Sequence, residues 1–189
     1  MEDGAKALNA AGVGTDMIAA WVKGALMPVD KIEVHRRGLH HPAVSVFVTG
    51  PLGILIQQRA AGKYHSAGLW ANTCCTHPHW GESTADCASR RLWQELGLRG
   101  LDLHPRGQVD YRADVGGGMV EHERVDVFVA ALAAAPKLSP DPAEVMAVRW
   151  ISLASLQAEL HATPARFTAW LRIYLADHAT RIFGDTGGQ

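Results

Sequence analysis

The local signal that most constrains this fold is an amphipathic helix predicted over residues 83–96. Ser83 followed by Asp86 resembles an N-terminal capping box, and Gly97 supplies a typical helix stop. The apolar positions of the segment lie on one stripe: Ala85, Ala88, Leu92 and Leu96. Such a helix is stable mainly when its apolar stripe is covered, so the rest of the chain must supply a packing partner.

Segments typical of β-strands lie on both sides of this helix. Residues 43–48 and 52–57 are apolar and partly β-branched, and the Thr-Gly-Pro sequence between them predicts a hairpin turn. Residues 120–130 alternate like a strand, and residues 145–151 form a further strand candidate. The order strands, helix, strands and final helix predicts one mixed α/β domain.

Helices are also predicted near the two ends of the chain. Residues 17–27 are a candidate for a short helix. Thr163 is placed to cap the final helix, with Pro164 at its first position. One side of that helix carries a mostly apolar stripe: Phe167, Trp170, Leu171, Tyr174 and His178. Residues 62–70 and 136–142 read as connecting loops.

Length and composition fit one domain with short appendages. The chain has 189 residues, of which 48% are hydrophobic, and this is enough for a core. We expect residues 1–23 to be a flexible N-terminal lead-in and residues 181–189 to be a flexible tail. Residues 24–180 would then form the folded domain.

Charge and cysteine content restrict the cellular setting and the partners. The formal net charge of −1 gives no strong attraction to nucleic acid or to an acidic membrane surface. The sequence contains no apolar run that could span a bilayer and no pattern of a signal peptide. Three cysteines, two of them adjacent, make a poor disulfide framework, which favours reduced thiols in the cytoplasm. We expect no nucleic-acid or membrane partner, and a monomer or weak homodimer.

The first candidate for chemistry is the segment 70–82, which reads Trp-Ala-Asn-Thr-Cys-Cys-Thr-His-Pro-His-Trp-Gly-Glu. It lies just before the helix at 83–96, where free backbone N–H groups favour anions. Cys75 lies two residues from His77, a pattern typical of a catalytic thiol. A structural zinc site is the alternative, but the Cys-x-x-Cys spacing is missing.

A second candidate is the pair of carboxylates in Glu121-His122-Glu123. On a strand, Glu121 and Glu123 point the same way, about 7 Å apart. The same face continues as Val125, Val127 and Val129. Burying two unpaired carboxylates would cost several kcal/mol, and a metal ion or a shared proton would remove the conflict. Alternatively, this end of the strand emerges into water.

Clustered histidines add a metal hypothesis. Six of the ten histidines lie between positions 35 and 79: His35, His40, His41, His65, His77 and His79. His41 directly precedes a predicted strand, so its ring could reach toward the loop at His77. Lys31 and His35 lie shortly before it. Three histidines with two glutamates would suit Mn²⁺, Fe²⁺ or Zn²⁺ better than Mg²⁺ alone.

Residues 76–98 follow the Nudix signature, Gly-x5-Glu-x7-Arg-Glu-apolar-x-Glu-Glu-x-Gly-apolar, in a degenerate form. The matching positions are Thr76, Glu82, Arg90, Arg91, Leu92, Gln94, Glu95, Gly97 and Leu98. Thr76 replaces the leading glycine, and Arg91 and Gln94 replace two acids. Nudix hydrolases use those acids to hold Mg²⁺ and activate water, so their loss argues against hydrolysis. A solvated helix face is the alternative explanation for the remaining pattern.

Taken together, these motifs resemble the type 1 isopentenyl-diphosphate isomerases. The resemblance covers residues 24–180 and includes the Thr-Cys-Cys-Thr-His-Pro run, Tyr111-Arg-Ala, Glu121-His-Glu and Thr163-Pro with Trp170, in the family's order. It implies a Nudix-type α/β/α sandwich with a mixed β-sheet, bound divalent metals, and a prenyl diphosphate substrate whose carbon–carbon double bond is moved.

The resemblance also implies a role for each matched residue. Cys75 would be one acid/base group, and Glu123, helped by Tyr111, would be its partner on the opposite face of the substrate. Mn²⁺ or Zn²⁺ would be held by His35, His41, His77, Glu121 and Glu123. Mg²⁺ on the diphosphate would be held by Glu95 and the backbone carbonyl of Cys75. The diphosphate would be bound by Lys31, Arg59, Lys63 and Arg91, and Trp170 would lie over the hydrocarbon. His41 is preferred to His40 because counting back from Gly53 gives the family's register.

Simpler interpretations remain open for several of these residues. Arg59 and Lys63 could be ordinary solvated surface residues. Trp170 could serve only in core packing, and Tyr111 could cap a strand. Cys74 and Cys87 are read as small buried apolar residues.

Two other functions are compatible with parts of the pattern. A Nudix hydrolase of nucleoside or prenyl diphosphates would need helix acids that this sequence lacks. A metal- or nucleotide-binding regulatory module would bind its ligand without turnover. Retention of Cys75 together with Glu121 and Glu123 is hard to explain for such a module.

Overall fold

A mixed β-sheet forms the middle of the computed structural model, which describes residues 17–184. Its strands are β3 (His41–Gly50), β4 (Gly53–Arg59), β5 (Trp70–Ala71), β6 (Cys74–Thr76), β7 (His104–Gly116), β8 (Met119–Ala131) and β9 (Val145–Ile151). The main path through the sheet runs β5-β4-β3-β8-β7, with β6 paired to β3 and β9 paired to β4. Strands β3 and β8 run parallel, and the other pairs run antiparallel.

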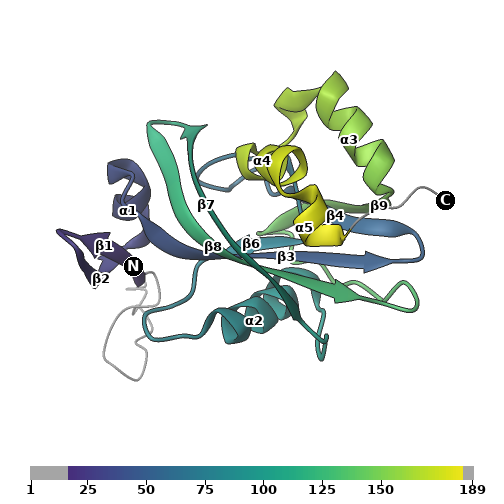
Figure 1. Cartoon of the computed structure of the whole chain (residues 1–189), viewed down its shortest axis with the longest axis horizontal. Coiled ribbons are helices and arrows are strands. Elements are labelled where there is room, and N and C mark those ends of the chain that lie inside the picture. Colours follow the sequence, from purple (N-terminus) through teal and green to yellow (C-terminus); the bar gives the residue numbers. More distant parts are fainter. Residues whose placement is uncertain (1–16, 185–189) are drawn as a thin grey trace, which may run out of the picture.

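Helices cover both faces of this sheet, as Figure 1 shows. Helix α2 (Thr84–Leu96) lies on one face, and α3 (Leu153–Ala162), α4 (Ala169–Asp177) and α5 (Ala179–Phe183) lie on the other. The predicted α/β/α sandwich with a mixed sheet is therefore confirmed. Within residues 17–184, none of the helices is both long and apolar enough to cross a membrane.

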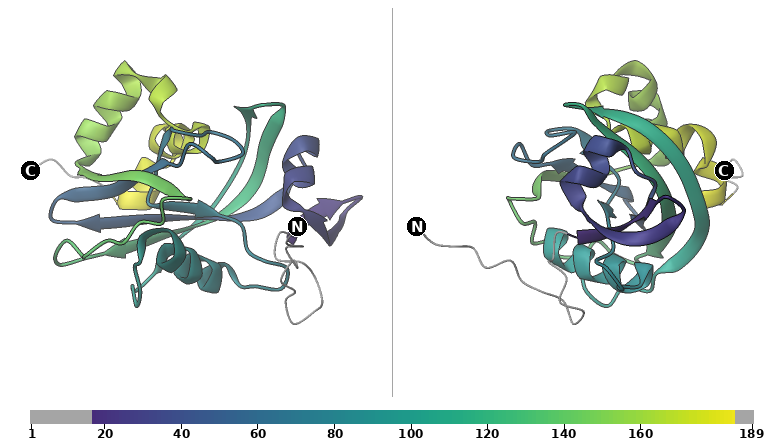
Figure 2. Two further views of the ribbon diagram at one scale, coloured as in Figure 1. Left: turned by 180° about the vertical axis from the view of Figure 1, so that it is seen from behind. Right: turned by 90° about the vertical axis from the view of Figure 1, so that its left-hand side faces the viewer.

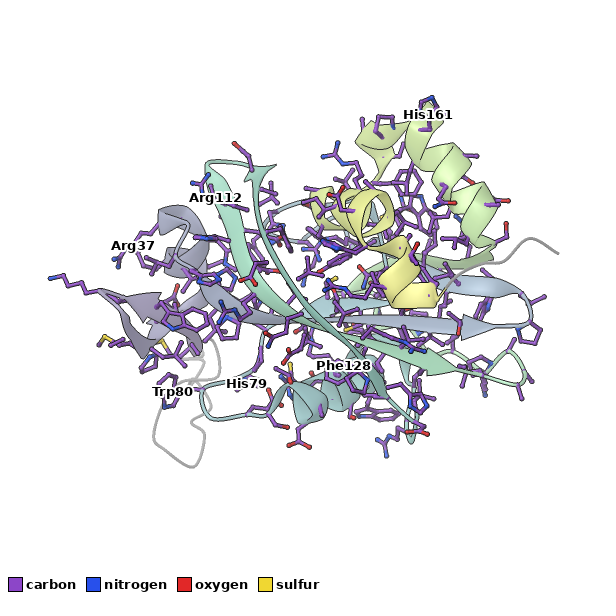
Figure 3. All side chains as sticks on the ribbon, viewed as in Figure 1. Arg37, His79, Trp80, Arg112, Phe128 and His161 are labelled. Carbon is purple, nitrogen blue, oxygen red and sulfur yellow. The ribbon has the colours of Figure 1, made fainter. Side chains whose placement is uncertain are left out.

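Strand β3 is buried on both faces, and its side chains alternate between two cores. Val44 and Val46 pack with Leu92 of α2, whereas Phe47 packs with Tyr174 of α4. Figure 3 shows side chains filling the space between the sheet and the helices on either side, with Phe128 labelled on the side of α2. The period of two in a strand explains why one apolar run serves both layers.

The predicted helix at 83–96 is confirmed as α2, together with its caps. Ser83 Oγ accepts a hydrogen bond from the backbone N–H of Asp86 at 3.1 Å, and Gly97 ends the helix in the left-handed conformation with φ 72°. The predicted β3–β4 hairpin is also confirmed. Gly53 has φ +106°, and a Cβ there would collide with the backbone of Ile151, so the turn requires glycine.

The prediction of a helix over residues 17–27 is wrong. Strands β1 (Met17–Val22) and β2 (Ala25–Asp30) form a hairpin, with Lys23 and Gly24 at positive φ in the turn. Ile18 and Ala20 are buried at a period of two, and Pro28 would disrupt a helix interior. The folded part thus begins within the predicted lead-in, while residues 1–16 and 185–189 lie outside the described residues.

Several elements were not predicted, among them α1 (Lys31–Arg37), β7 and α3, and the final helix differs from its prediction. Helices α1 and α3 bury few of their side chains, so their apolar pattern is weak. Strand β7 was missed although its apolar residues Val109, Tyr111, Ala113 and Val115 alternate with polar ones. Pro164 begins a 3₁₀ turn (Pro164–Arg166) rather than a long helix, and extended Phe167 separates that turn from α4. Figure 2 shows the long, curved β7 and β8 passing beside α1 and the β1–β2 hairpin.

Candidate active site

The two carboxylates of β8 lie where three strands meet. Glu123 has a strand partner on each side. His41 is its partner in the parallel strand β3, and Tyr111 is its partner in the antiparallel strand β7. Glu121 and Glu123 are 4% and 5% exposed. They share the buried face that continues with the valines of β8, as predicted from the alternation. The strand does not emerge into water at this end.

His35 and His41 are held by backbone carbonyls. The Nδ1–H of His35 donates to the carbonyl of Lys31 at 2.6 Å, and the Nδ1–H of His41 donates to the carbonyl of Leu39 at 2.7 Å. Each ring therefore keeps a lone pair on Nε2. Burial lowers the pKa of His35 to about 4, so its ring is neutral near pH 7. Neutral imidazoles held by a second hydrogen bond are typical metal ligands.

These histidines form a group that fits a divalent cation. Ligand atoms of His35, His41, His77 and Glu123 all lie within 4.8 Å of one another. His77 Nε2 lies 2.9 Å from Glu123 Oε1. Nε2 of His41 and Nδ1 of His77 are buried without a hydrogen-bond partner. Such orphaned nitrogens are costly, and for His41 a bound cation would remove that cost.

Tyr111 joins the two carboxylates. Its hydroxyl lies 2.8 Å from Glu121 Oε2 and 2.7 Å from Glu123 Oε2. Burial and the neighbouring charge of Glu123 raise the pKa of Glu121 well above its usual value. Burial alone would also raise the pKa of Glu123, but contacts from His41 and His77 hold that pKa well below its usual value. One hydroxyl proton can be donated to only one carboxylate at a time, so the three groups share protons as a unit.

Strand β6 decides which of the two adjacent cysteines reaches this site. Cys75 pairs with Ser45 of β3, and Cys74 pairs with Val46, so the two side chains point to opposite faces. Cys74 is fully buried in the core against α2, as predicted, and Cys87 lies in the same core. Cys75 faces the cavity that also contains Glu121 and Glu123.

The thiol of Cys75 is held by two polar neighbours. It donates a hydrogen bond to Asn72 Oδ1 at 2.9 Å, and its sulfur lies 2.9 Å from Ser45 Oγ. The side-chain amide of Asn72 is fixed in this orientation, because its Nδ2 donates hydrogen bonds to the backbone carbonyls of Val46 and Cys74. Ser45 in turn donates to the hydroxyl of Tyr174 at 2.9 Å. Burial raises the pKa of Cys75, so the sulfur carries a proton at neutral pH.

The four predicted basic residues line the same cavity. Its remaining walls include the thiol, the carboxylates and Trp170; the basic residues are Lys31, Arg59, Lys63 and Arg91. Arg59 is only 9% exposed, donates to the carbonyl of His65 at 3.1 Å, and lies over the Trp170 ring. Its interpretation as a solvated surface residue is wrong. Burial lowers the pKa of Lys31 to about 8.

Carboxylates that face these cations complete the wall. Glu95 is 4% exposed and accepts hydrogen bonds from Gln57 at 2.8 Å and from Arg91 at 2.6 Å. Glu144 contacts both Lys63 at 2.6 Å and Arg91 at 3.1 Å. Another acid of the Nudix signature, Glu82, is paired with Arg90 instead. Glu95 is the signature acid that lines the cavity.

Sequence reasoning missed several residues of this site: Ser45, Gln57, Tyr64, His65, Asn72, Glu144 and Tyr174. Most are polar residues whose partners come from distant segments, so no spacing identifies them. His65 is the exception, because it belongs to the cluster of histidines that the sequence already shows.

Comparisons with known proteins decide the family. A sequence model of the NUDIX domain matches residues 39–171. Isopentenyl-diphosphate Delta-isomerase of a Cereibacter sphaeroides strain is 60% identical over 169 residues, which are 89% of this chain and 96% of that protein. The Delta-isomerase of Rhodobacter capsulatus is 55% identical over 168 residues, with 89% and 96% covered. The chain belongs to the isopentenyl-diphosphate Delta-isomerase family.

Solved structures support the same fold. DR0079 from Deinococcus radiodurans aligns with a TM-score of 0.68 at 12% identity, over 88% of this chain and 98% of that one. A MutT NUDIX hydrolase from Burkholderia pseudomallei aligns with a TM-score of 0.56 at 22% identity, over 72% and 95%. The Delta-isomerase family therefore shares its fold with a Nudix hydrolase.

Proposed function

We propose that this protein is an isopentenyl-diphosphate isomerase, which interconverts isopentenyl diphosphate and dimethylallyl diphosphate. One observation carries the proposal: a protonated thiol and a pair of buried carboxylates, from separate strands, line one cavity with four basic residues. The basic residues suit a diphosphate. The thiol and the carboxylates are two acid/base groups for the five-carbon chain.

The reaction needs two groups because one proton is added while another is removed. Protonation of the terminal CH₂ of isopentenyl diphosphate leaves positive charge on the branched carbon. Loss of a proton from the neighbouring CH₂ then forms the new double bond. We assign one transfer to Cys75, and the other to Glu123 with the help of Tyr111. Asn72 and Ser45 orient the sulfur, and Tyr111 is placed to hand a proton between Glu121 and Glu123.

Trp170 is placed to stabilise the cationic intermediate. Its indole is 1% exposed and lines the cavity beside Arg59. An aromatic face in a site without water attracts a cation by about 2 kcal/mol or more. On its side of the cavity the indole also takes the place of water, which would capture the cation. Trp170 thus serves the substrate in addition to packing in the core.

We expect Trp170→Leu to lower kcat about 30-fold, since about 2 kcal/mol of cation–π stabilisation is lost. Trp170→Phe keeps an aromatic face and should retain most of the activity. Trp93→Phe, on the exposed side of α2, is the matched control. Steady-state kinetics with isopentenyl diphosphate measure the effect, and equal kcat values for the leucine and phenylalanine variants would contradict it.

Two divalent cations complete the proposed site. Mn²⁺ or Zn²⁺ would be held by His35, His41, His77, Glu121 and Glu123, whose neutral nitrogens and carboxylates suit such ions. Mg²⁺ would be held by Glu95 and the carbonyl of Cys75, next to the basic residues. When bound, the cations neutralise negative charge on the carboxylates and on the diphosphate.

Substrate entry requires side chains to move. The free space inside the cavity is about 30 Å³, much less than a five-carbon diphosphate occupies. Lys63 and Arg91 are both engaged by Glu144. We propose that the diphosphate replaces the Glu144 carboxylate as the partner of both side chains. Until substrate arrives, Glu144 would hold the Lys63 ammonium and the Arg91 guanidinium in place.

Substrate binding should depend on pH through Lys31. Its pKa is lowered to about 8, first by burial and then by the neighbouring charges of Lys63 and Arg91. Lys31 is charged below that pH and neutral above it, so KM should rise as pH increases through about 8. Lys31→Arg stays charged throughout and should remove this rise. A pH profile of KM for both proteins tests the prediction, and parallel profiles would contradict it.

Incubation with isopentenyl diphosphate in heavy water tests the function itself. Dimethylallyl diphosphate carrying deuterium is the expected product, and chelator should stop its formation. Release of phosphate would instead indicate a hydrolase, and tight binding without product would indicate a regulatory module. We also propose a cytoplasmic monomer or weak homodimer; the three free cysteines, Cys74, Cys75 and Cys87, are compatible with a reducing compartment.

A further inference from the structure

A fourth histidine lies at the proposed metal centre. Besides the group of His35, His41, His77 and Glu123, a second group has its ligand atoms within 4.8 Å of one another: His35, His65 and Glu121. His65 comes from the loop after β4 and is 6% exposed. Its Nε2 lies 3.3 Å from Glu121 Oε1. Each carboxylate of the pair therefore has an imidazole nitrogen beside it.

The two groups cannot hold separate ions, because they share His35. The Nδ1–H of His35 is donated to the carbonyl of Lys31 at 2.6 Å, so only Nε2 has a lone pair. One lone pair binds one metal ion. The two groups must therefore either compete for His35 or belong to a single centre.

The distances inside each group fit an octahedral ion, but the six ligand atoms do not all lie within 4.8 Å of one another, so a bound ion would have to draw the two groups together. Around an octahedral ion with bonds of about 2.1 Å, neighbouring ligand atoms lie about 3 Å apart and opposite ones about 4 Å apart. Nε2 of His77 and Nε2 of His41 lie 2.9 and 3.5 Å from Glu123 Oε1. The distance of 3.3 Å from His65 to Glu121 falls in the same range.

We infer that His65 is a sixth ligand, which together with His35, His41, His77, Glu121 and Glu123 saturates one octahedral ion. This inference rests on the proposed metal centre and extends it. Six protein donors leave no position for water on the ion. The centre would then hold the two carboxylates in place without presenting a metal-bound hydroxide to a carbocation, which suits an isomerase built on a hydrolase fold.

The loop around His65 is built to hold the ring in this position. Arg59 donates to the backbone carbonyl of His65 at 3.1 Å, and the ring stands edge-to-face with Trp170 at 5.9 Å between centroids. His65 Nδ1 lies 3.2 Å from Ser66 Oγ. Ser66 adopts a positive φ of 49°, unusual for a residue with a side chain. If Nδ1–H donates to the serine, the lone pair of Nε2 is free for the ion.

The unmodified protein gives the first test. We would load it with Mn²⁺ and count the coupled imidazole nitrogens by pulsed electron paramagnetic resonance. Four coordinated histidines are expected, and three would overturn the inference while leaving the proposed centre intact. Failure to bind any divalent ion would instead overturn the centre and the inference together.

The His65→Ala variant gives the second test, with His40→Ala on the neighbouring surface as the matched control. In the Co²⁺-loaded protein, loss of one of six ligands should strengthen the visible absorption bands, and added imidazole should restore the original spectrum. Chelator should remove the ion at least about 10-fold faster. An unchanged Co²⁺ spectrum in His65→Ala would overturn the inference and reduce His65 to a hydrogen-bond donor for Glu121.

Discussion

Cys75→Ala should lower the isomerisation rate on the order of 10³-fold, because a general acid/base group contributes about 10²- to 10⁴-fold. The buried thiol carries a proton that is directed by Asn72 and Ser45, and an alanine has none to exchange. Incorporation of deuterium from heavy water into dimethylallyl diphosphate should disappear with the activity. The measurement is kcat together with the deuterium content of recovered substrate and product.

Cys74→Ala is the matched control for this experiment. Cys74 is the neighbouring cysteine, but its side chain is buried against α2 on the other face of the sheet. We expect a modest loss of stability, typical of a small core truncation, and a rate within a few-fold of the original. Near-normal activity in Cys75→Ala, with an intact fold, would end the assignment of the thiol.

Glu123→Gln should have an effect of similar size, on the order of 10³-fold in kcat. Glutamine keeps the shape of the side chain but cannot take up a proton. Glu123 is also a proposed metal ligand, so bound metal must be measured in the same samples. A variant that keeps its metal and loses its activity would separate the acid/base role from the ligand role.

Tyr111→Phe refines this second prediction. It removes the hydroxyl at 2.7 Å from Glu123 without removing a proposed ligand, so it should lower kcat by roughly 10- to 100-fold while metal content stays the same. Glu159→Gln, which loses a paired carboxylate on α3, serves as the control. Full activity in Glu123→Gln with metal bound would show that another group moves this proton.

Prediction of the fold from sequence succeeded where the signal is local. The caps of α2, its apolar stripe and the β3–β4 turn all lie within a few residues of one another, and the structure has them as predicted. It missed helices α1 and α3, which bury few side chains. It also missed the edge strand β7, although Val109, Tyr111, Ala113 and Val115 alternate with polar residues and are more buried than those neighbours. The β1–β2 hairpin was mistaken for a helix because it is short.

For the site, the sequence by itself determined which chemical groups are present. It supplied the thiol-histidine run, the paired carboxylates on one strand face, the clustered histidines and the basic residues, because residue type and a period of two are local properties.

Only the tertiary structure decided how these groups meet. The register of a three-residue strand turns Cys75 toward the cavity and Cys74 into the core. The parallel pairing of β3 with β8 sets His41 beside Glu123, and the loop after β4 brings His65 to Glu121. Strand register and loop position depend on the sum of many distant packing contacts, so spacing along the chain does not contain them.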